Sequence, residues 1–226
     1  MRTSSRRDDG TTVKRWSAAL VCVLALSGCS SENPEPRADH LCTVADPSAE
    51  RDLLRQIMRS DGFETQVNKT TRNLTARLEE DLRSMPSGDE TDSAGFCTYI
   101  PEPEPAKDHL RVRMDVRWQP QGFKKRPPQD AVPFVANEAV GETGDTGTLL
   151  RVRCEMPGEL RVPSDKAVLS VEASYGVSVP HTDMVQGDRD RQTSLAYLMT
   201  RRVTEALGCE NKPLAKAPVV KPLSTP

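Results

Sequence analysis

The chain contains six cysteines, and four of them restrict the possible fold more than any other feature. These four are Cys42, Cys97, Cys154 and Cys209. An even number of cysteines in an exported protein indicates disulfides, and four cysteines allow three connectivities. We expect sequential pairing, Cys42 with Cys97 and Cys154 with Cys209, because each loop then spans 55 residues and its closure stabilises the fold by about 4 kcal/mol in the chain-entropy treatment. Zinc bound by the four cysteines is the alternative, although the chain has neither CxxC nor HxxxH.

The first 28 residues have the order of a secretory signal. Basic residues (Arg2, Arg6, Arg7, Lys14 and Arg15) precede an apolar run over residues 16–26, and small residues follow that run. As a helix the run rises only about 16 Å, roughly half of a hydrocarbon core, so it is too short to be a permanent span. We therefore expect it to be removed. The general secretory route is the expected one, and the Arg6-Arg7 pair leaves the twin-arginine route open.

The end of this signal resembles a lipid-attachment motif. Leu26-Ser27-Gly28-Cys29 is similar to the lipobox of bacterial lipoproteins, in which the cysteine is acylated and becomes the first residue. The resemblance implies that Cys29 carries palmitate-like chains and anchors the protein to the outer face of the cytoplasmic membrane. Each buried CH₂ contributes about 0.8 kcal/mol, so two or more chains would hold the protein there permanently. An ordinary cleaved signal peptide is the alternative.

Composition divides the chain into four parts. We expect a signal peptide over residues 1–28, a flexible tether over 29–40, a single domain over 41–210 and a disordered proline-rich tail over 211–226. After residue 28 the chain has 26 basic and 31 acidic residues, a formal net charge of -5. This balance argues against general nucleic-acid binding and against adhesion to anionic lipid by charge alone.

Hydrophobic periodicity predicts an α+β domain. Three amphipathic helices are expected. The first begins with Asp46 as N-cap and Pro47 as its first residue, and ends near Gly62. The second covers residues 70–85, and the third covers residues 195–207 and ends in a glycine cap at Gly208. Period-two alternation predicts strands over residues 110–118, 150–156 and 167–175, and residues 96–100 are a short strand candidate. The fold class expected is an antiparallel sheet of about four or more strands, with helices on one face and two disulfides.

Two stretches of the chain look like weak copies of one unit. In each, a strand with a cysteine is followed by a proline and a second strand, which predicts two hairpins in one sheet. Cys154 is expected on the apolar face of its strand, and Cys209 at the end of a helix that covers that face. Their pairing is therefore geometrically natural, whereas the same reasoning is weaker for Cys42.

The layout as a whole resembles one group of proteins. The LSGC motif, the four cysteines, the Cys97-Thr98-Tyr99 strand and the closing RRVTEALGCE helix are similar to small cell-surface lipoproteins of actinomycetes. The resemblance implies an envelope location and an α+β fold with disulfides. It supplies no catalytic residues, because members of that group are largely of unknown function.

The polar side of the predicted sheet carries the sharpest binding hypothesis. Five arginines alternate with apolar residues: Arg111, Arg113, Arg117, Arg151 and Arg153. If their two strands are neighbours, five guanidiniums face one way and can hold a phosphate-bearing or carboxylate-bearing envelope component bidentately. The alternative is a solvated face on which Asp115, Glu155 and Glu172 balance the arginines across strands.

The chain lacks the common catalytic signatures. It has no GxSxG, P-loop, HExxH or GxGxxG, and the three histidines (His40, His109 and His181) have no metal-ligand spacing. We therefore expect no catalytic residue, metal or cofactor, and a lipid-anchored extracytoplasmic binding or accessory module of the bacterial envelope. Its expected partners are the membrane, through the anchor, and an anionic envelope component or a protein. The alternatives are an envelope hydrolase with dispersed catalytic residues and a purely structural or sensory lipoprotein.

Overall fold

A computed structural model describes residues 41–102, 111–123, 130–176 and 185–222 of the 226-residue chain. Eight strands form one antiparallel sheet in the order β1-β2-β3-β7-β6-β5-β4-β8. The strands are β1 (Gly62–Val67), β2 (Ala94–Glu102), β3 (Arg111–Pro120), β4 (Val132–Ala136), β5 (Ala139–Gly144), β6 (Gly147–Val152), β7 (Ala167–Gly176) and β8 (Val220–Pro222). The helices are α1 (Ala49–Met58), α2 (Thr71–Arg83), α3 (Arg161–Ser164), which follows a 3₁₀ turn over Gly158–Leu160, and α4 (Gln186–Leu207).

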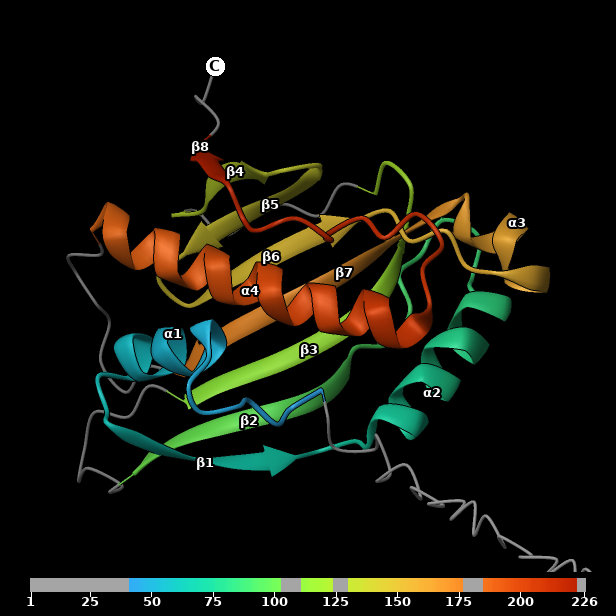
Figure 1. Ribbon diagram of the computed structural model, residues 1–226. Helices are drawn as coiled ribbons and strands as arrows, with labels where there is room; N and C mark the ends of the chain where they lie inside the picture. The colour runs from blue at the N-terminus through green and yellow to red at the C-terminus, as the bar shows by residue number, and fades with distance from the viewer. Residues whose placement is uncertain (1–40, 103–110, 124–129, 177–184, 223–226) are drawn as a thin grey trace, which may run out of the picture. The chain divides into compact units, whose positions relative to one another are not determined.

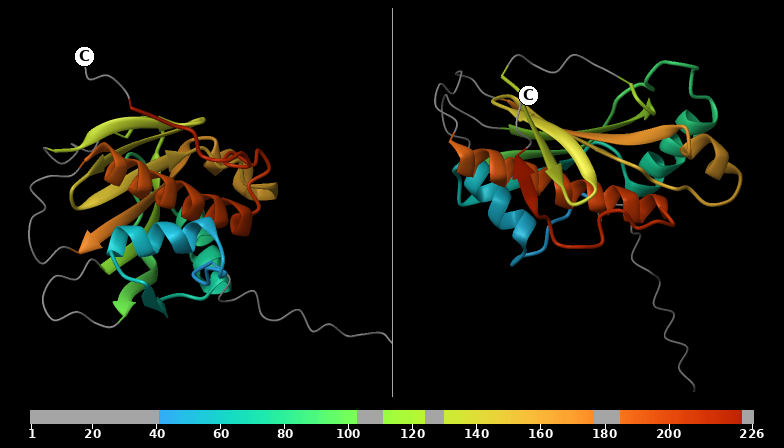
Figure 2. Two further views of the ribbon diagram at one scale, coloured as in Figure 1. Left: turned by 60° about the vertical axis from the view of Figure 1, so that its left-hand side comes forward. Right: turned by 90° about the horizontal axis from the view of Figure 1, so that it is seen from above.

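The molecule has two layers. Helices α1, α2 and α4 cover one face of the sheet (Figure 1), and Figure 2 shows the same layering from two further directions. Within the described part of the chain no helix lies over the opposite face, which we call the open face. The predicted α+β class, with an antiparallel sheet, helices on one face and two disulfides, is confirmed.

The core lies between the sheet and the helices. The apolar positions of the two longest central strands are fully or almost fully buried there: Val112, Met114, Val116 and Trp118 of β3, and Leu169, Val171, Ala173 and Tyr175 of β7. The Trp118 indole Nε1 donates a hydrogen bond of 2.8 Å to the carbonyl of Leu78 and so fixes α2 on the sheet. The period-two pattern therefore predicted both strands and the face that each one buries.

Helix α1 begins two residues later than the sequence predicts. Ser48 is its N-cap, and the Ser48 hydroxyl accepts a hydrogen bond of 3.2 Å from the Arg51 amide. Asp46 instead forms ion pairs with Arg51 and Arg55. The aspartate can therefore favour the helix only through its charge, while serine satisfies an amide of the first turn. Helix α2 matches its prediction closely, with Thr70 as N-cap.

Both predicted disulfides are present. Cys42 is bonded to Cys97 and Cys154 to Cys209. The predicted position of Cys154 on a strand is wrong, because β6 ends at Val152 and Cys154 follows it in the connection toward α3. From that connection Cys154 still meets Cys209, which lies just beyond the glycine cap of α4 at Gly208.

The C-terminal segment differs from the disordered tail that the sequence predicts. Leu214 is buried in the core, and Val220–Pro222 adds strand β8 to the edge of β4. The described part of this segment, residues 211–222, therefore completes the sheet. The prolines that suggest disorder are compatible with this arrangement, because an edge strand tolerates proline.

Candidate functional site

The open face brings together two of the five candidate arginines, Arg117 and Arg151. Arg117 of β3 lies opposite Ser170 of β7, and Ser170 lies opposite Arg151 of β6. Strand β7 therefore separates the two arginine-bearing strands, which the binding hypothesis took as neighbours. Because directly opposed residues of antiparallel strands share a face, Arg117 and Arg151 still flank the buried Ser170 on one surface.

Carboxylates already bind these two guanidiniums. Arg151 forms a bidentate pair with Glu142, with N–O distances of 3.0 and 3.2 Å, and its Nε donates to the amide oxygen of Gln119. Arg117 pairs with Glu172 at 2.8 Å and with Glu90 at 3.4 Å. The Gln119 amide also donates to Glu90 and so joins the two groups. We call Glu90, Arg117, Gln119, Glu142, Arg151 and Glu172 the open-face network.

The remaining three arginines lie outside this network. Arg113 is 60% exposed and pairs with Asp115 on its own strand. Arg111 begins β3 and is exposed, as is Arg153, which lies beyond the end of β6. Glu172 therefore balances Arg117 across strands, as the solvated-face alternative predicts. Asp115 instead pairs within its own strand, and Glu155 pairs with Arg161.

The network limits what the open face can bind. It contains two arginines and three carboxylates, so its formal charge is negative. An anionic ligand would have to displace Glu142 or Glu172 from its guanidinium, and the displaced Glu142 would lose a bidentate pair. A cluster of five guanidiniums open to phosphate is therefore not what the described residues form.

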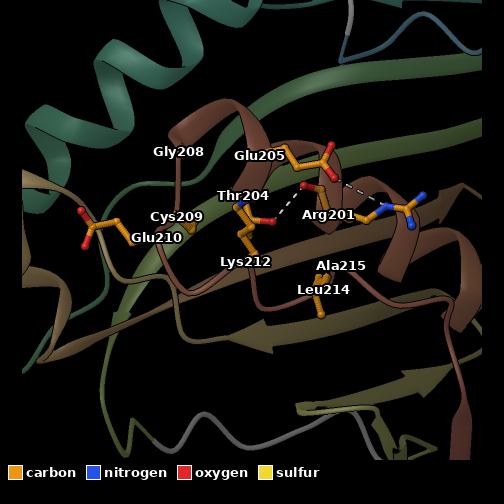
Figure 3. A pocket seen from close by; sticks show the side chains of 9 residues that line it. All are labelled: Arg201, Thr204, Glu205, Gly208, Cys209, Glu210, Lys212, Leu214 and Ala215. Atoms are coloured by element: carbon orange, nitrogen blue, oxygen red, sulfur yellow. Dashed lines mark hydrogen bonds and ion pairs between the residues drawn. The ribbon is translucent and has the colours of Figure 1, made fainter.

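A half-open cavity of about 370 Å³ lies where α4 ends. Figure 3 shows the lining side chains, with the Arg201 guanidinium directed toward the Glu205 carboxylate, 4.0 Å away. The Thr204 hydroxyl donates to the Arg201 carbonyl, and the Cys209 sulfur is held in a disulfide. A disulfide sulfur is no thiolate nucleophile. The cavity thus offers room for a side chain, but Arg201 and Glu205 pair with each other, and Glu210 pairs with Arg161 outside the lining.

Two tyrosines have the strongest shifts in ionisation among the described residues. Burial raises the pKa of Tyr99 and of Tyr175 well above the ordinary tyrosine value. The Tyr99 hydroxyl donates to the Cys42 carbonyl at 3.0 Å, and the Tyr175 hydroxyl to the Gln192 carbonyl at 3.4 Å. Both groups are neutral at physiological pH and fix the packing of α4 and the N-terminal segment. Their surroundings are not those of an acid or base poised near pH 7.

Comparison with known proteins gives no relative. No protein-family model, curated protein or solved structure matches the chain. The site must therefore be interpreted from its own chemistry.

Within residues 41–222, as far as they are described, no three His, Cys, Asp or Glu side chains are grouped as metal ligands, and no helix is long and apolar enough to cross a bilayer. Cys29, the predicted acylation site, and the three histidines lie outside the described residues.

Proposed function

We propose that the chain is a lipid-anchored extracytoplasmic protein that serves as a non-enzymatic binding or accessory module of the bacterial cell envelope. The observation that supports this most directly is the use of the cysteines. The four cysteines of the folded part form two disulfides, which persist in oxidising compartments. Cys29 stands apart from them, directly after the small residues of the LSGC motif.

The partner that we favour is a protein of the envelope. The open-face network supports this choice over an anionic polymer, because its arginines already have carboxylate partners. Beside the network and on the same face, β5 exposes Val140, which is 48% exposed and lies opposite the half-buried Val135 of β4. Exposed apolar side chains next to fixed charges are typical of protein interfaces.

The anchor is tested by fractionation of cells that express the full-length protein. Cys29→Ala should move the protein from the membrane fraction to the soluble extracytoplasmic fraction and remove the acyl mass from its N-terminal peptide. Cys22→Ala is the matched control, because this cysteine lies in the same leader but outside the LSGC motif. It should leave fractionation unchanged.

A membrane fraction that retains the Cys29→Ala protein would contradict the anchor. The same cells also test the compartment, since peptides mapped without reduction should contain the Cys42–Cys97 and Cys154–Cys209 links. Recovery of these four cysteines as free thiols in the cytoplasm would overturn the proposal as a whole.

A further inference from the structure

We propose that the outer edge of strand β4 is a docking site for an extended peptide strand. In the structure the chain's own residues Val220–Pro222 occupy it, and we infer that the same segment of a second copy can replace them by strand exchange. This inference does not depend on the lipid anchor.

The docking site recognises main-chain atoms. In β8, Val220, Lys221 and Pro222 pair with Ala136, Val135 and Phe134 of β4. The segment before β8 is also held through its carbonyls. The side-chain amide of Asn137 donates a hydrogen bond of 2.9 Å to the Ala217 carbonyl. The Tyr197 hydroxyl donates one of 3.1 Å to the Lys216 carbonyl. The Asn137 backbone amide donates to the Val219 carbonyl at 3.3 Å. Binding of this kind is typical of strand addition to a sheet edge.

The segment is held weakly by its side chains. Leu214 is its last buried residue, and of residues 215–222 only Val220 packs against the core, partly buried. A stretch with few apolar contacts and exposed hydrogen bonds opens at a free energy well below that of global unfolding. We therefore expect β8 to leave β4 while the rest of the sheet stays folded.

Strand β4 is poorly protected once β8 has left. Its sequence is Val132-Pro133-Phe134-Val135-Ala136. Charged residues and prolines hinder pairing at a sheet edge, and this strand has no charged residue and one proline, Pro133. Its amides and carbonyls then form a free sheet edge, which is a template for pairing with another strand.

The occupant that fits this edge is the corresponding segment of a second copy. That segment makes the same main-chain pairs and places the same valine beside Ala136, so exchange loses no contact. Val220 lies six residues after Leu214, a separation that reaches up to about 20 Å when the chain is extended. This length lets two neighbouring molecules exchange segments while Leu214 and Cys209 keep their places in each core.

Mixing two variants of the full-length protein, each with one added cysteine, tests the exchange. Val135→Cys is made in one and Lys221→Cys in the other, because these residues are directly paired across β4 and β8 and cross-strand neighbours have a Cα separation that a disulfide can span. After mild oxidation we expect a covalent heterodimer with a peptide link between positions 135 and 221. Its yield should rise with protein concentration and fall when a synthetic peptide of residues 213–226 is added.

Val140→Cys mixed with Lys221→Cys is the matched control. Position 140 is exposed on the same face, but it lies one strand further in, on β5, beyond disulfide reach of β8. We expect at least tenfold less heterodimer from this pair. The double variant Val135→Cys/Lys221→Cys should close within one chain. If it closes and the mixed variants form no heterodimer, the segment stays on its own β4 and exchange is refuted. If it does not close, the β4–β8 pairing is itself absent and the proposal fails.

Discussion

Arg151 illustrates how the surroundings of a residue decide its role. From the sequence it is one of several arginines that alternate with apolar residues along a strand. In the structure its side chain is 15% exposed, and three of its N–H groups bind Glu142 and Gln119. Guanidinium pairs that are bidentate and partly shielded from water are stronger than exposed single contacts. Arg151 therefore serves to hold β5, β6 and β3 together.

A double-mutant cycle measures this pair. We expect Arg151→Ala and Glu142→Ala to be coupled by about 1 kcal/mol in the free energy of unfolding, obtained from urea titrations. The Arg113–Asp115 pair is the control, because Arg113 is 60% exposed and solvent screens such contacts to a few tenths of a kcal/mol. Equal coupling energies for the two pairs would contradict the shielding that we infer for the open-face network.

The first helix shows what local sequence rules can and cannot resolve. Asp46 and Ser48 are both good N-cap residues, and the proline between them favours the earlier start. The structure selects Ser48, whose hydroxyl accepts the Arg51 amide, and leaves Asp46 to pair with arginines on the helix surface. Local helix rules rank both residues as caps and therefore do not distinguish them.

Single substitutions at the two positions distinguish their roles. Ser48→Ala should lower the free energy of unfolding by about 1 kcal/mol, independently of salt, because it removes the acceptor of a first-turn amide. Asp46→Ala should cost no more than about 0.5 kcal/mol, and this cost should vanish at high salt, since the Asp46 side chain is 55% exposed. Denaturant titrations at low and high ionic strength provide the comparison, and a larger loss at Asp46 would reverse the assignment.

The strands divide into four that were predicted from the sequence and four that were missed. The four predicted strands correspond to β2, β3, β6 and β7, which are adjacent in the centre of the sheet and alternate clearly between core and open face. The missed strands β1, β4, β5 and β8 lie toward the edges. Edge strands bury fewer side chains, and of β1 only Phe63 is buried. These strands form because a neighbouring strand offers hydrogen-bond partners, and their own sequences show little alternation of apolar and polar residues.

Strand β5 also contains glycines, which usually argue against a strand. At Gly141 the reason is packing: a Cβ there would lie 2.2 Å from the Leu149 carbonyl oxygen and 2.6 Å from the Phe134 ring. Glycine lets β4, β5 and β6 approach one another closely. This requirement arises from residues on two other strands, so the local sequence could not reveal it.

The candidate site was predictable only in part. Alternation correctly placed Arg113 and Arg117 on the face away from the helices. It could not give the strand order, which inserts β7 between β3 and β6. Nor could it show that Glu90, in the connection from α2 to β2, and Glu142, on an unpredicted strand, reach the guanidiniums. Contacts between different strands and connections therefore make an internal network where the binding hypothesis had placed an anion site.

At the scale of the whole molecule, each disulfide links a segment at or beside the sheet to a segment outside it. Cys42–Cys97 joins the N-terminal segment to β2, and Cys154–Cys209 joins the connection after β6 to the end of α4. Helix α4 extends across β5, β6 and β7 between them, and α1 packs against it. The core that they enclose holds Tyr99 beside Cys42 and Tyr175 beside α4. The stability of the molecule therefore depends on two tyrosines that must stay neutral.

This dependence predicts a loss of stability in alkali. Burial raises the pKa of Tyr99 and Tyr175 in the folded protein, whereas the unfolded chain ionises near pH 10. The unfolded state therefore loses protons first, so the free energy of unfolding is constant for these groups below pH 10 and falls above it by up to about 1.4 kcal/mol per pH unit for each tyrosine. Tyr99→Phe should cost about 1 kcal/mol at pH 7, through the lost hydrogen bond, and should have a shallower decline between pH 10 and 11. Urea titrations at pH 7, 9, 10 and 11 measure both effects, and an unchanged slope in Tyr99→Phe would show that this hydroxyl ionises in the folded state as readily as in water.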